Sequence, residues 1–249
     1  MLPLLKGSAQ SHPDPWLGNI IGKNVFRLDF PRSISRKVSL QKKHLKRLSR
    51  PSFFYVKIHS NETSLLKTLT TMGFYVVDVG LTFQRIGSVV KGTSKGSMVI
   101  RQTSEKDRAD VLRIAKTSFR YSRFHSDPLI SKEIANKIKM KWVDNFYSGK
   151  RGNALFVAEK KGRILGFLLS LKKGKGRKEV NIIDLIATTN KAKGKGVGLS
   201  LIYGFMKSFK SKKALFQVGT QAVNIPSVRL YEKCGFRLIG TQYVLHGHF

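Results

Sequence analysis

A short turn in the last third of the sequence combines alternating glycines with lysines. It consists of Lys193, Gly194, Lys195, Gly196, Val197 and Gly198. Glycine lets the backbone approach a ligand closely, and the helix expected after the turn offers free N–H groups and the positive end of its dipole. The lysines add charge for the same ligand. The turn therefore predicts a pyrophosphate site, although an ordinary tight turn with solvated lysines has the same features.

Two common phosphate-binding motifs do not fit this turn. The Rossmann motif needs an acidic residue about 20 positions later, at a strand end, and a place early in a parallel sheet. Neither condition is met after Gly198, and no Gly-Lys-Ser or Gly-Lys-Thr sequence is present for a P-loop. If the turn binds an anion, it does so in another kind of site.

The elements that position the turn are strands and helices in regular succession. Apolar runs predict strands over residues 154–160, 163–171, 179–189 and 214–221. The first three read as an antiparallel meander, and the turn with its amphipathic helix follows the third. Because that helix crosses over, the third and fourth strands are expected to be parallel.

Helices are also expected on either side of this unit. Ser104 and Asp107 form a capping-box sequence before one helix, and a second helix is expected over residues 131–147. A short helix over residues 227–234 is followed by closing strands within 236–246. Together these elements indicate one mixed domain.

The first part of the chain reads as a smaller unit. Its expected elements are strands near residues 25–30, 53–59 and 75–83 and helices near residues 39–48 and 62–74. Residues 87–97 are rich in Gly, Ser and Lys without a hydrophobic period, as linkers are. We therefore expect a small α/β domain over residues 1–97 and a larger domain over residues 98–249.

The chain is strongly basic. Lysine and arginine outnumber acidic residues 47 to 14, which gives a formal net charge of +33. Such a surface attracts nucleic acid, an anionic membrane or phosphorylated ligands, but a general lysine bias would give the same number. The basic stretch 171–178 lies between two expected strands, where a solvated hairpin tip is favoured over a nucleic-acid patch. We expect no specific nucleic-acid partner.

Cysteine and histidine usage narrows the chemistry. A lone cysteine, Cys234, excludes an internal disulfide framework and a zinc site built on several thiolates. The six histidines show no metal-ligand spacing, so we expect no metal. No apolar run of about 18 residues predicts a transmembrane segment, and the first residues are too weakly apolar for a signal peptide. These features predict a soluble, cytoplasmic protein.

The glycine turn resembles the Q/R-x-x-G-x-G/A element of the GNAT acetyltransferases. Lys193, Gly196 and Gly198 take its first, fourth and sixth positions, and lysine keeps the charge but loses the guanidinium fork. Asn224, followed by LYEKCGF at residues 230–236, is similar to a second GNAT element. The resemblance implies an α/β (mixed α+β) GNAT fold, with a central mixed, mostly antiparallel sheet flanked by helices after the smaller α/β domain.

The same resemblance implies roles for particular residues, with acetyl-CoA as the co-substrate. The strand residues whose backbone would bind the acetyl carbonyl are Leu185, Ile186, Ala187 and Thr188. Tyr231 matches the tyrosine that protonates the coenzyme A sulfur, and a phenol of pKa about 10 suits a thiolate of pKa about 8.5. It would equally serve to pack its helix. Asn224 is expected to face the cofactor and Gln221 the substrate.

The general base is open between two residues. Asp184 on the central strand and His125 in the loop between the first two helices could each accept the proton of the substrate amine through a water molecule. Asp184 could instead belong to a structural network, and His125 could be a surface residue. A substrate amine that arrives neutral needs no strong base.

A narrower resemblance points to the dTDP-fucosamine (dTDP-4-amino-4,6-dideoxy-D-galactose) acetyltransferase family. Its marks are Trp16 with residues 18–28, residues 57–74, Ser122-Arg123-Phe124, Trp142 with Asn145, and residues 220–231. The resemblance implies that Ser122, Arg123 and Phe124 bind a nucleotide-linked substrate. The alternative is a loop that Phe124 merely anchors.

The leading hypothesis is N-acetylation of a nucleotide-linked amino sugar of the dTDP-4-amino-4,6-dideoxyhexose type, for a surface polysaccharide. A second hypothesis keeps the GNAT chemistry but acetylates a protein N-terminus, a polyamine or another small amine. A third, of another class, is a nucleic-acid-binding module without turnover. The sequence leaves open whether the chain forms a homodimer.

Overall fold

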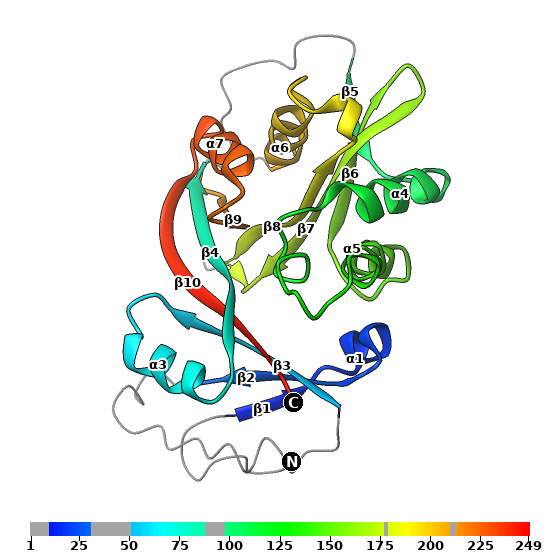
Figure 1. Cartoon of the computed structure of the whole chain (residues 1–249). Coiled ribbons are helices and arrows are strands. Elements are labelled where there is room, and N and C mark those ends of the chain that lie inside the picture. Colours follow the sequence, from blue (N-terminus) through cyan, green and yellow to red (C-terminus); the bar gives the residue numbers. More distant parts are fainter. Residues whose placement is uncertain (1–9, 31–50, 88–97, 177–178, 210–212) are drawn as a thin grey trace. The chain divides into compact units, whose positions relative to one another are not determined.

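Figure 1 shows the computed structural model of the chain, which describes residues 10–30, 51–87, 98–176, 179–209 and 213–249. The chain forms two compact units. Unit 1 comprises Met1–Gly80, Tyr121–Ala135 and Thr241–Phe249, and unit 2 comprises Leu81–Arg120 and Asn136–Gly240. Strands β4 (Tyr75–Ile86) and β10 (Arg237–His248) have residues in both units.

Unit 1 contains a sheet with a helix on one face. β1 (Gln10–Pro13) is antiparallel to β2 (Asn24–Asp29), β2 is parallel to β3 (Ser52–His59), and the last part of β10 is antiparallel to β3. Helix α3 (Thr63–Thr71) buries its apolar side against this sheet. The core consists of Leu28, Phe54, Val56, Ile58, Leu65, Leu69, Met72, Phe74 and Leu245.

A short helix in unit 1 was not expected from the sequence. Helix α1 (Pro15–Ile21) begins where the Asp14 carboxylate accepts a hydrogen bond from the Leu17 amide at 3.0 Å, with proline at the first helical position. It ends at Gly22, whose φ of 78° is left-handed. At 7 residues the helix is too short to show the apolar period that sequence reasoning relies on.

Unit 2 contains the predicted meander. β5 (Val99–Gln102), β6 (Ala154–Lys160), β7 (Arg163–Lys173) and β8 (Val180–Thr188) pair antiparallel in that order. β9 (Leu215–Gln221) is parallel to β8, and helix α6 (Val197–Lys207) connects the two. The predicted parallel pair with a crossover helix is therefore confirmed.

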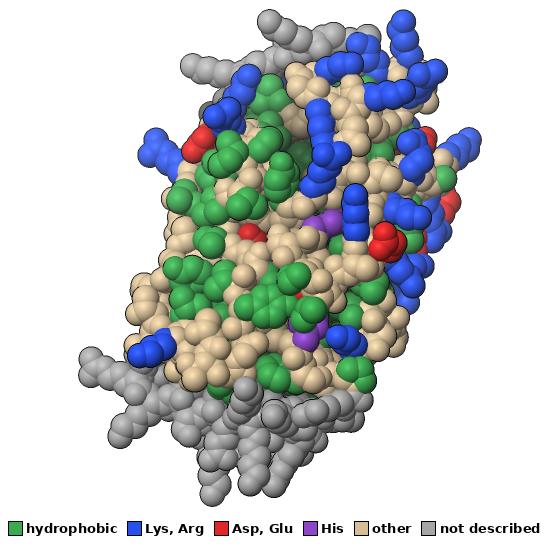
Figure 2. Space-filling model, viewed as in Figure 1, with side chains coloured by type: hydrophobic (Ala, Val, Ile, Leu, Met, Phe, Trp, Pro, Cys, Tyr) green, Lys and Arg blue, Asp and Glu red, His purple; other side chains and the backbone are tan. Residues whose placement is uncertain are grey.

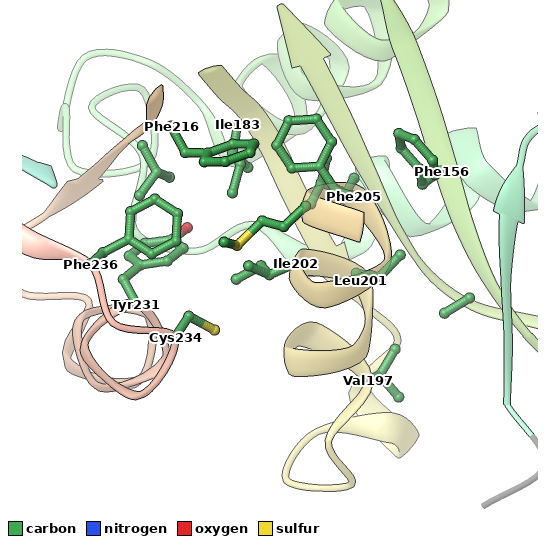
Figure 3. Close-up of a cluster of buried hydrophobic side chains, with 14 of the residues drawn as sticks. Phe156, Ile183, Val197, Leu201, Ile202, Phe205, Phe216, Tyr231, Cys234 and Phe236 are labelled. Carbon is green, nitrogen blue, oxygen red and sulfur yellow. The ribbon is translucent and has the colours of Figure 1, made fainter. Parts of the chain in front are cut away.

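Alternate residues of the unit 2 strands enter two different cores. On β6, Phe156 and Ala158 pack on the side of α6 and α7 (Ile225–Lys233), as Figure 3 shows in part. Leu155 and Val157 pack on the opposite side with α4 (Arg108–Ser118) and α5 (Lys132–Tyr147). Because both faces are covered, the strands read as nearly continuous apolar runs.

The predicted start of α4 is confirmed. The Ser104 side chain bonds to the Asp107 backbone, and the Asp107 carboxylate accepts from the Ser104 amide at 2.7 Å, in a short turn (Glu105–Asp107) that leads into the helix. Arg101 also donates to both Asp107 oxygens, at 2.7 and 2.9 Å. The hydrogen bonds from Arg101 and Ser104 hold the pKa of the Asp107 carboxyl well below its usual range.

Some expectations fall outside the described residues. The predicted helix at residues 39–48, the predicted linker except Gly87, and the end of the basic stretch 171–178 lie there. The compact units also differ from a division at residue 97, because residues 121–135 and 241–249 belong to unit 1 and residues 81–87 to unit 2. The boundary of independent folding domains stays a prediction. No helix among the described residues combines the length and apolar character needed to cross a bilayer.

Candidate active site

The glycine turn begins helix α6 with left-handed backbone at two positions. Gly194 has a φ of 75° and Gly196, the N-cap residue, a φ of 78°. The first helical hydrogen bond runs from the Ser200 amide to the Gly196 carbonyl at 3.0 Å, so the three amides before Ser200 have no partner inside the helix. A Cβ at either glycine would meet no atom within 4 Å. The turn is therefore an open backbone surface with donors available to an anion.

The lysines of the turn face solvent. Lys193 and Lys195 are exposed, whereas Ala192 and Val197 on either side of the turn are buried. The apolar pair holds the turn against the unit 2 core, and the lysines stay free to meet a ligand. The residues predicted to bind a pyrophosphate thus lie together on one short surface segment.

The central strand β8 separates from β9 close to this turn. The two strands pair from Val180–Leu215 to Ile183–Val218, yet β8 continues to Thr188 and β9 to Gln221. On its other side β8 stays paired with β7 as far as Thr188. Residues 185–188 therefore have one edge without a ladder partner among the described residues, which leaves backbone groups for a ligand.

The separation coincides with a β-bulge at Asp184. Ser170 pairs with Ile183 and Leu169 pairs with Leu185, so Asp184 has no residue opposite it on β7. The bulge changes the face on which residues lie: Ile183 belongs to the α6 core, whereas Leu185 belongs to the α4 and α5 core. In a regular strand these two residues would share a face.

Asp184, one of the two candidate bases, accepts hydrogen bonds from three donors on two side chains. Arg151 donates from Nε to Oδ2 and from Nη2 to Oδ1, both at 2.8 Å. Trp142 donates from Nε1 to Oδ2 at 3.0 Å, and the Asp184 side chain is only 10% exposed. This arrangement favours the structural network over the base. The sequence signal was a lone carboxylate in an apolar strand, but nothing nearby pointed to Arg151 as its partner.

Tyr231 lies in the unit 2 core at the end of α7. Its side chain faces α6 together with Cys234 and Phe236 (Figure 3), and the residue is 3% exposed. Burial raises the pKa of the Tyr231 phenol well above its ordinary value and the pKa of the Cys234 thiol to about 12. The phenol therefore stays protonated at neutral pH.

Asn224 is the N-cap of α7. Its Oδ1 accepts from the Ser227 amide at 3.4 Å, and its Nδ2 donates to Thr220 Oγ1 at 3.3 Å. Capping accounts for this residue, so its predicted contact with the cofactor remains a prediction. Gln221 ends β9 and is half-buried.

The predicted substrate loop lies in unit 1, where its side chains make contacts, although Arg123 Nη1 is buried without a hydrogen-bond partner among the described residues. Phe124 is 1% exposed and Ser122 is 5% exposed, with Ser122 Oγ at 2.6 Å from His125 Nδ1. The Arg123 guanidinium lies 4.0 Å from the centre of the Tyr55 ring, and its burial lowers its pKa. These contacts favour the interpretation that Phe124 anchors the loop. Substrate binding by Ser122, Arg123 and Phe124 remains a prediction, as does the role of His125.

A buried carboxylate in unit 1 joins the same loop to β10. Asp127 Oδ2 lies 2.6 Å from His246 Nδ1 and 2.9 Å from His248 Nε2, and Oδ1 accepts from Tyr75 at 2.6 Å and from the Leu129 amide at 2.9 Å. Burial alone would raise the pKa of Asp127, but these hydrogen bonds outweigh burial and hold it well below the usual range. Burial lowers the pKa of His246 to about 4.

The Asp127 network also has the composition of a metal site. The ligand atoms of Asp127, His246 and His248 lie within 4.8 Å of one another. The sequence analysis missed that two histidines spaced by two on a strand share one face. In this structure both nitrogens contact the carboxylate at hydrogen-bond distance, and Lys23 Nζ lies 3.3 Å from the other nitrogen of His248. The geometry is that of a hydrogen-bonded network, and the expected absence of a metal stays a prediction.

The face of the molecule in Figure 2 is basic. Figure 2 shows Lys and Arg side chains scattered over the visible face, with few carboxylates among them. Several arginines are used inside the structure, since Arg101, Arg108 and Arg151 each pair with an Asp or Glu side chain. The basic character is therefore not confined to one patch on this face.

The described strands and helices form the fold of an acetyltransferase. The structure is similar to that of a GCN5-related N-acetyltransferase from Sphaerobacter thermophilus, with a TM-score of 0.60 and 12% identity over 96% of this chain and 76% of that one. The predicted fold class, a mixed sheet flanked by helices, is confirmed.

The sequence assigns the family. The model of the acetyltransferase (GNAT) family matches residues 113–236, so the chain belongs to the GNAT superfamily through a domain that holds β8, the glycine turn and Tyr231. The spore coat polysaccharide biosynthesis protein SpsD of Bacillus subtilis is 30% identical over 141 residues, which are 56% of this chain and 47% of that protein. N-acetylaspartate synthetase of Xenopus tropicalis is 25% identical over 111 residues, 43% of this chain and 40% of that protein. The chain spans less than half the length of these two relatives.

Proposed function

We propose that the chain is an acetyl-CoA-dependent N-acetyltransferase. The observation that carries the proposal is the separation of β8 from β9 after Ile183–Val218, beside a helix whose first amides are open. The open amides and two exposed lysines suit the pyrophosphate of coenzyme A, and the unpaired edge of residues 185–188 suits the acetyl carbonyl. The family match supports the same assignment.

In the proposed reaction a neutral amine attacks the carbon of the acetyl thioester. Backbone N–H groups of residues 185–188 stabilise the negative charge that develops on the carbonyl oxygen. As the carbon–sulfur bond breaks, the Tyr231 hydroxyl donates its proton to the departing sulfur, and the proton that the amine loses returns through water to the phenolate. Burial raises the pKa of the Tyr231 phenol, so the hydroxyl carries its proton at neutral pH, and the same shift makes it a weaker acid than an exposed tyrosine.

No strong base is included in this proposal. Both Asp184 oxygens already accept hydrogen bonds from Arg151 or Trp142, so a further proton would have to displace a charge-assisted contact. His125 belongs to unit 1 and contacts Ser122. An amine that arrives neutral makes a base unnecessary.

We propose a nucleotide-linked amino sugar as the acceptor, in polysaccharide biosynthesis. The support is the similarity to SpsD, whose name places it in polysaccharide synthesis, together with the basic surface, which suits a diphosphate. The similarity to N-acetylaspartate synthetase favours a second candidate, an anionic amino acid such as aspartate. Polyamines fit the charge less well, since a cationic acceptor needs carboxylates around it.

The test is release of free thiol from acetyl-CoA in the presence of a panel of acceptors. The panel contains dTDP-amino sugars, aspartate, a polyamine and a basic peptide. We expect release with the sugars. Release with aspartate alone would replace the sugar by the second candidate, and no release with any amine, despite binding of coenzyme A, would contradict the enzymatic proposal.

A further inference from the structure

Asp184 has a role that fits its contacts better than proton transfer. We infer that Asp184, Arg151 and Trp142, here called the Asp184 cluster, position the backbone of β8 that meets the acetyl group, an inference that rests on the proposed function. The cluster acts through the backbone of residues 185–188. Its members are positioning residues and do not touch the reacting atoms.

The bulge needs something to hold it in place. A strand gains a ladder partner for every residue when it is regular, and a bulge leaves one residue without a partner. Moving the bulge by one position would turn either Ile183 or Leu185 to the wrong core. Apolar packing thus fixes the position of the bulge, and the contacts of Asp184 restrain the backbone there.

The contacts of Asp184 are directional. The two-pronged contact with Arg151 uses both carboxylate oxygens at 2.8 Å, and charge-assisted hydrogen bonds of this kind are about twice as strong as neutral ones. The indole N–H of Trp142 adds a third donor at 3.0 Å. Three donors from two side chains leave the Asp184 side chain, and hence its Cα, little freedom to turn.

Both partners are themselves held by α5 and the segment after it. The Arg151 guanidinium lies 4.7 Å from the Trp142 ring centre, and the Lys139 ammonium lies 5.1 Å from the same ring. The Arg151 amide donates to the Asn145 carbonyl at 3.1 Å, which ties the segment after α5 to the end of the helix. The cluster therefore connects a rigid helix to the bulge, and a shift of α5 would move the backbone next to residues 185–188.

The inference is tested by Asp184→Asn, which keeps the size of the side chain and removes its charge. Asp144→Asn is the matched control, because Asp144 is held by Arg108 at 2.8 and 3.1 Å and is also mostly buried, but on α5. We expect kcat to fall about tenfold or more in Asp184→Asn, since misplacement of about 1 Å costs that much or more. The Kd of coenzyme A without an acetyl group should stay within about twofold. Asp144→Asn should change neither quantity.

Two further measurements separate positioning from simple stability. Hydrogen exchange of residues 183–189 should be faster in Asp184→Asn than in the unmodified chain or in Asp144→Asn. Arg151→Lys, which keeps the charge but loses the fork, should give an intermediate kcat.

Equal effects of Asp184→Asn and Asp144→Asn, or an unchanged kcat in Asp184→Asn, would overturn the inference while the proposed function stands. An unmodified chain that binds coenzyme A without thiol release contradicts the proposed function and the inference with it, whatever the exchange rates are.

Discussion

At the scale of single residues, the surroundings decide what an ionisable side chain can do. Tyr231 and Asp184 were both candidates for proton transfer. Burial keeps the Tyr231 phenol protonated at neutral pH, as the proposed acid must be. Asp184 is partly buried, and Arg151 and Trp142 hold both of its oxygens.

Tyr231→Phe should therefore lower kcat far more than it raises KM for acetyl-CoA. The ring still fills the core beside Phe83 and Phe236, so only the proton donor is lost. Steady-state kinetics with acetyl-CoA checks this. Tyr147→Phe is the control, since its hydroxyl contacts Thr103 at 2.8 Å; unchanged turnover in Tyr231→Phe would remove the acid role.

The Asp127 network should make the chain sensitive to acid. Asp127 has a folded-state pKa below its unfolded one, so its contribution to stability is present above about pH 4 and is lost as the pH falls. The pKa of His246 is about 4 in the folded state and 6.5 ordinarily. As the pH falls from 6.5 to 4, the unfolded state therefore binds the proton more readily, and the contribution of His246 to stability is lost. Asp127 and His246 thus change the free energy of unfolding in the same direction. This free energy should decrease steadily from about pH 7 to pH 4.

Thermal unfolding at several pH values measures this dependence. Asp127→Asn should lower the unfolding free energy by about 3 kcal/mol or more at neutral pH and flatten the acid side of the curve. Asp29→Asn, at an exposed ion pair, should do neither. Because the geometry is that of hydrogen bonds, a chelator should leave the transition unchanged; a drop in Tm on chelation would instead indicate a bound metal.

At the scale of elements, the junction of β8 and α6 concentrates the irregular backbone of unit 2. The bulge at Asp184, the end of pairing with β9 and the left-handed Gly194 and Gly196 follow within a few residues of one another. Irregular backbone of this kind exposes N–H groups that a regular strand or helix would use internally.

Gly196→Ala should weaken coenzyme A binding through this backbone. A left-handed φ strains alanine by roughly 1 kcal/mol, and the new Cβ enters the open space in front of the turn. Gly162→Ala is a matched control, because Gly162 also has a positive φ, 71°, and equally open surroundings at a hairpin tip.

Calorimetry and thermal unfolding compare the two glycine variants. Both should lose similar stability, but only Gly196→Ala should raise the Kd of coenzyme A, by about tenfold, or about 1.4 kcal/mol. Equal Kd values for the two variants would argue against a ligand at the turn.

At the scale of the whole molecule, each of the two units is built from separate stretches of the chain. Phe83, 2% exposed, belongs to the unit 2 core although it precedes residue 97. Gln84 accepts from Gln217 at 3.0 Å, and Arg85 donates to the Cys234 carbonyl. The residues after Gly80 thus complete unit 2, although the composition of residues 87–97 suggested a boundary further on.

A fragment of residues 98–249 should accordingly be much less stable than one of residues 81–249. Loss of a buried phenylalanine costs about 3–5 kcal/mol, which lowers Tm by roughly 10 °C in a chain of this size. Circular dichroism melts of the two fragments make the comparison. Similar Tm values would support independent folding from residue 98 onward.

The local features were predictable because their causes act over a few residues. The capping box at Ser104 and Asp107, the strand periods of β6 to β9 and the glycine turn each depend on neighbours close in the chain, and all lie where the sequence placed them. The parallel pairing of β8 with β9 followed from the crossover helix.

The partners of buried polar groups could be identified only from the tertiary structure. Asp184 and Arg151 are 33 positions apart and Asp127 and His246 are 119 apart, and no local period joins them. A buried charge must find a partner wherever the fold brings one, so the choice depends on packing and not on spacing. By itself the sequence determined a GNAT-like strand, turn and helix that could bind an anion; the tertiary structure decided that Arg151 and Trp142 hold the Asp184 carboxylate and that Tyr231 is buried.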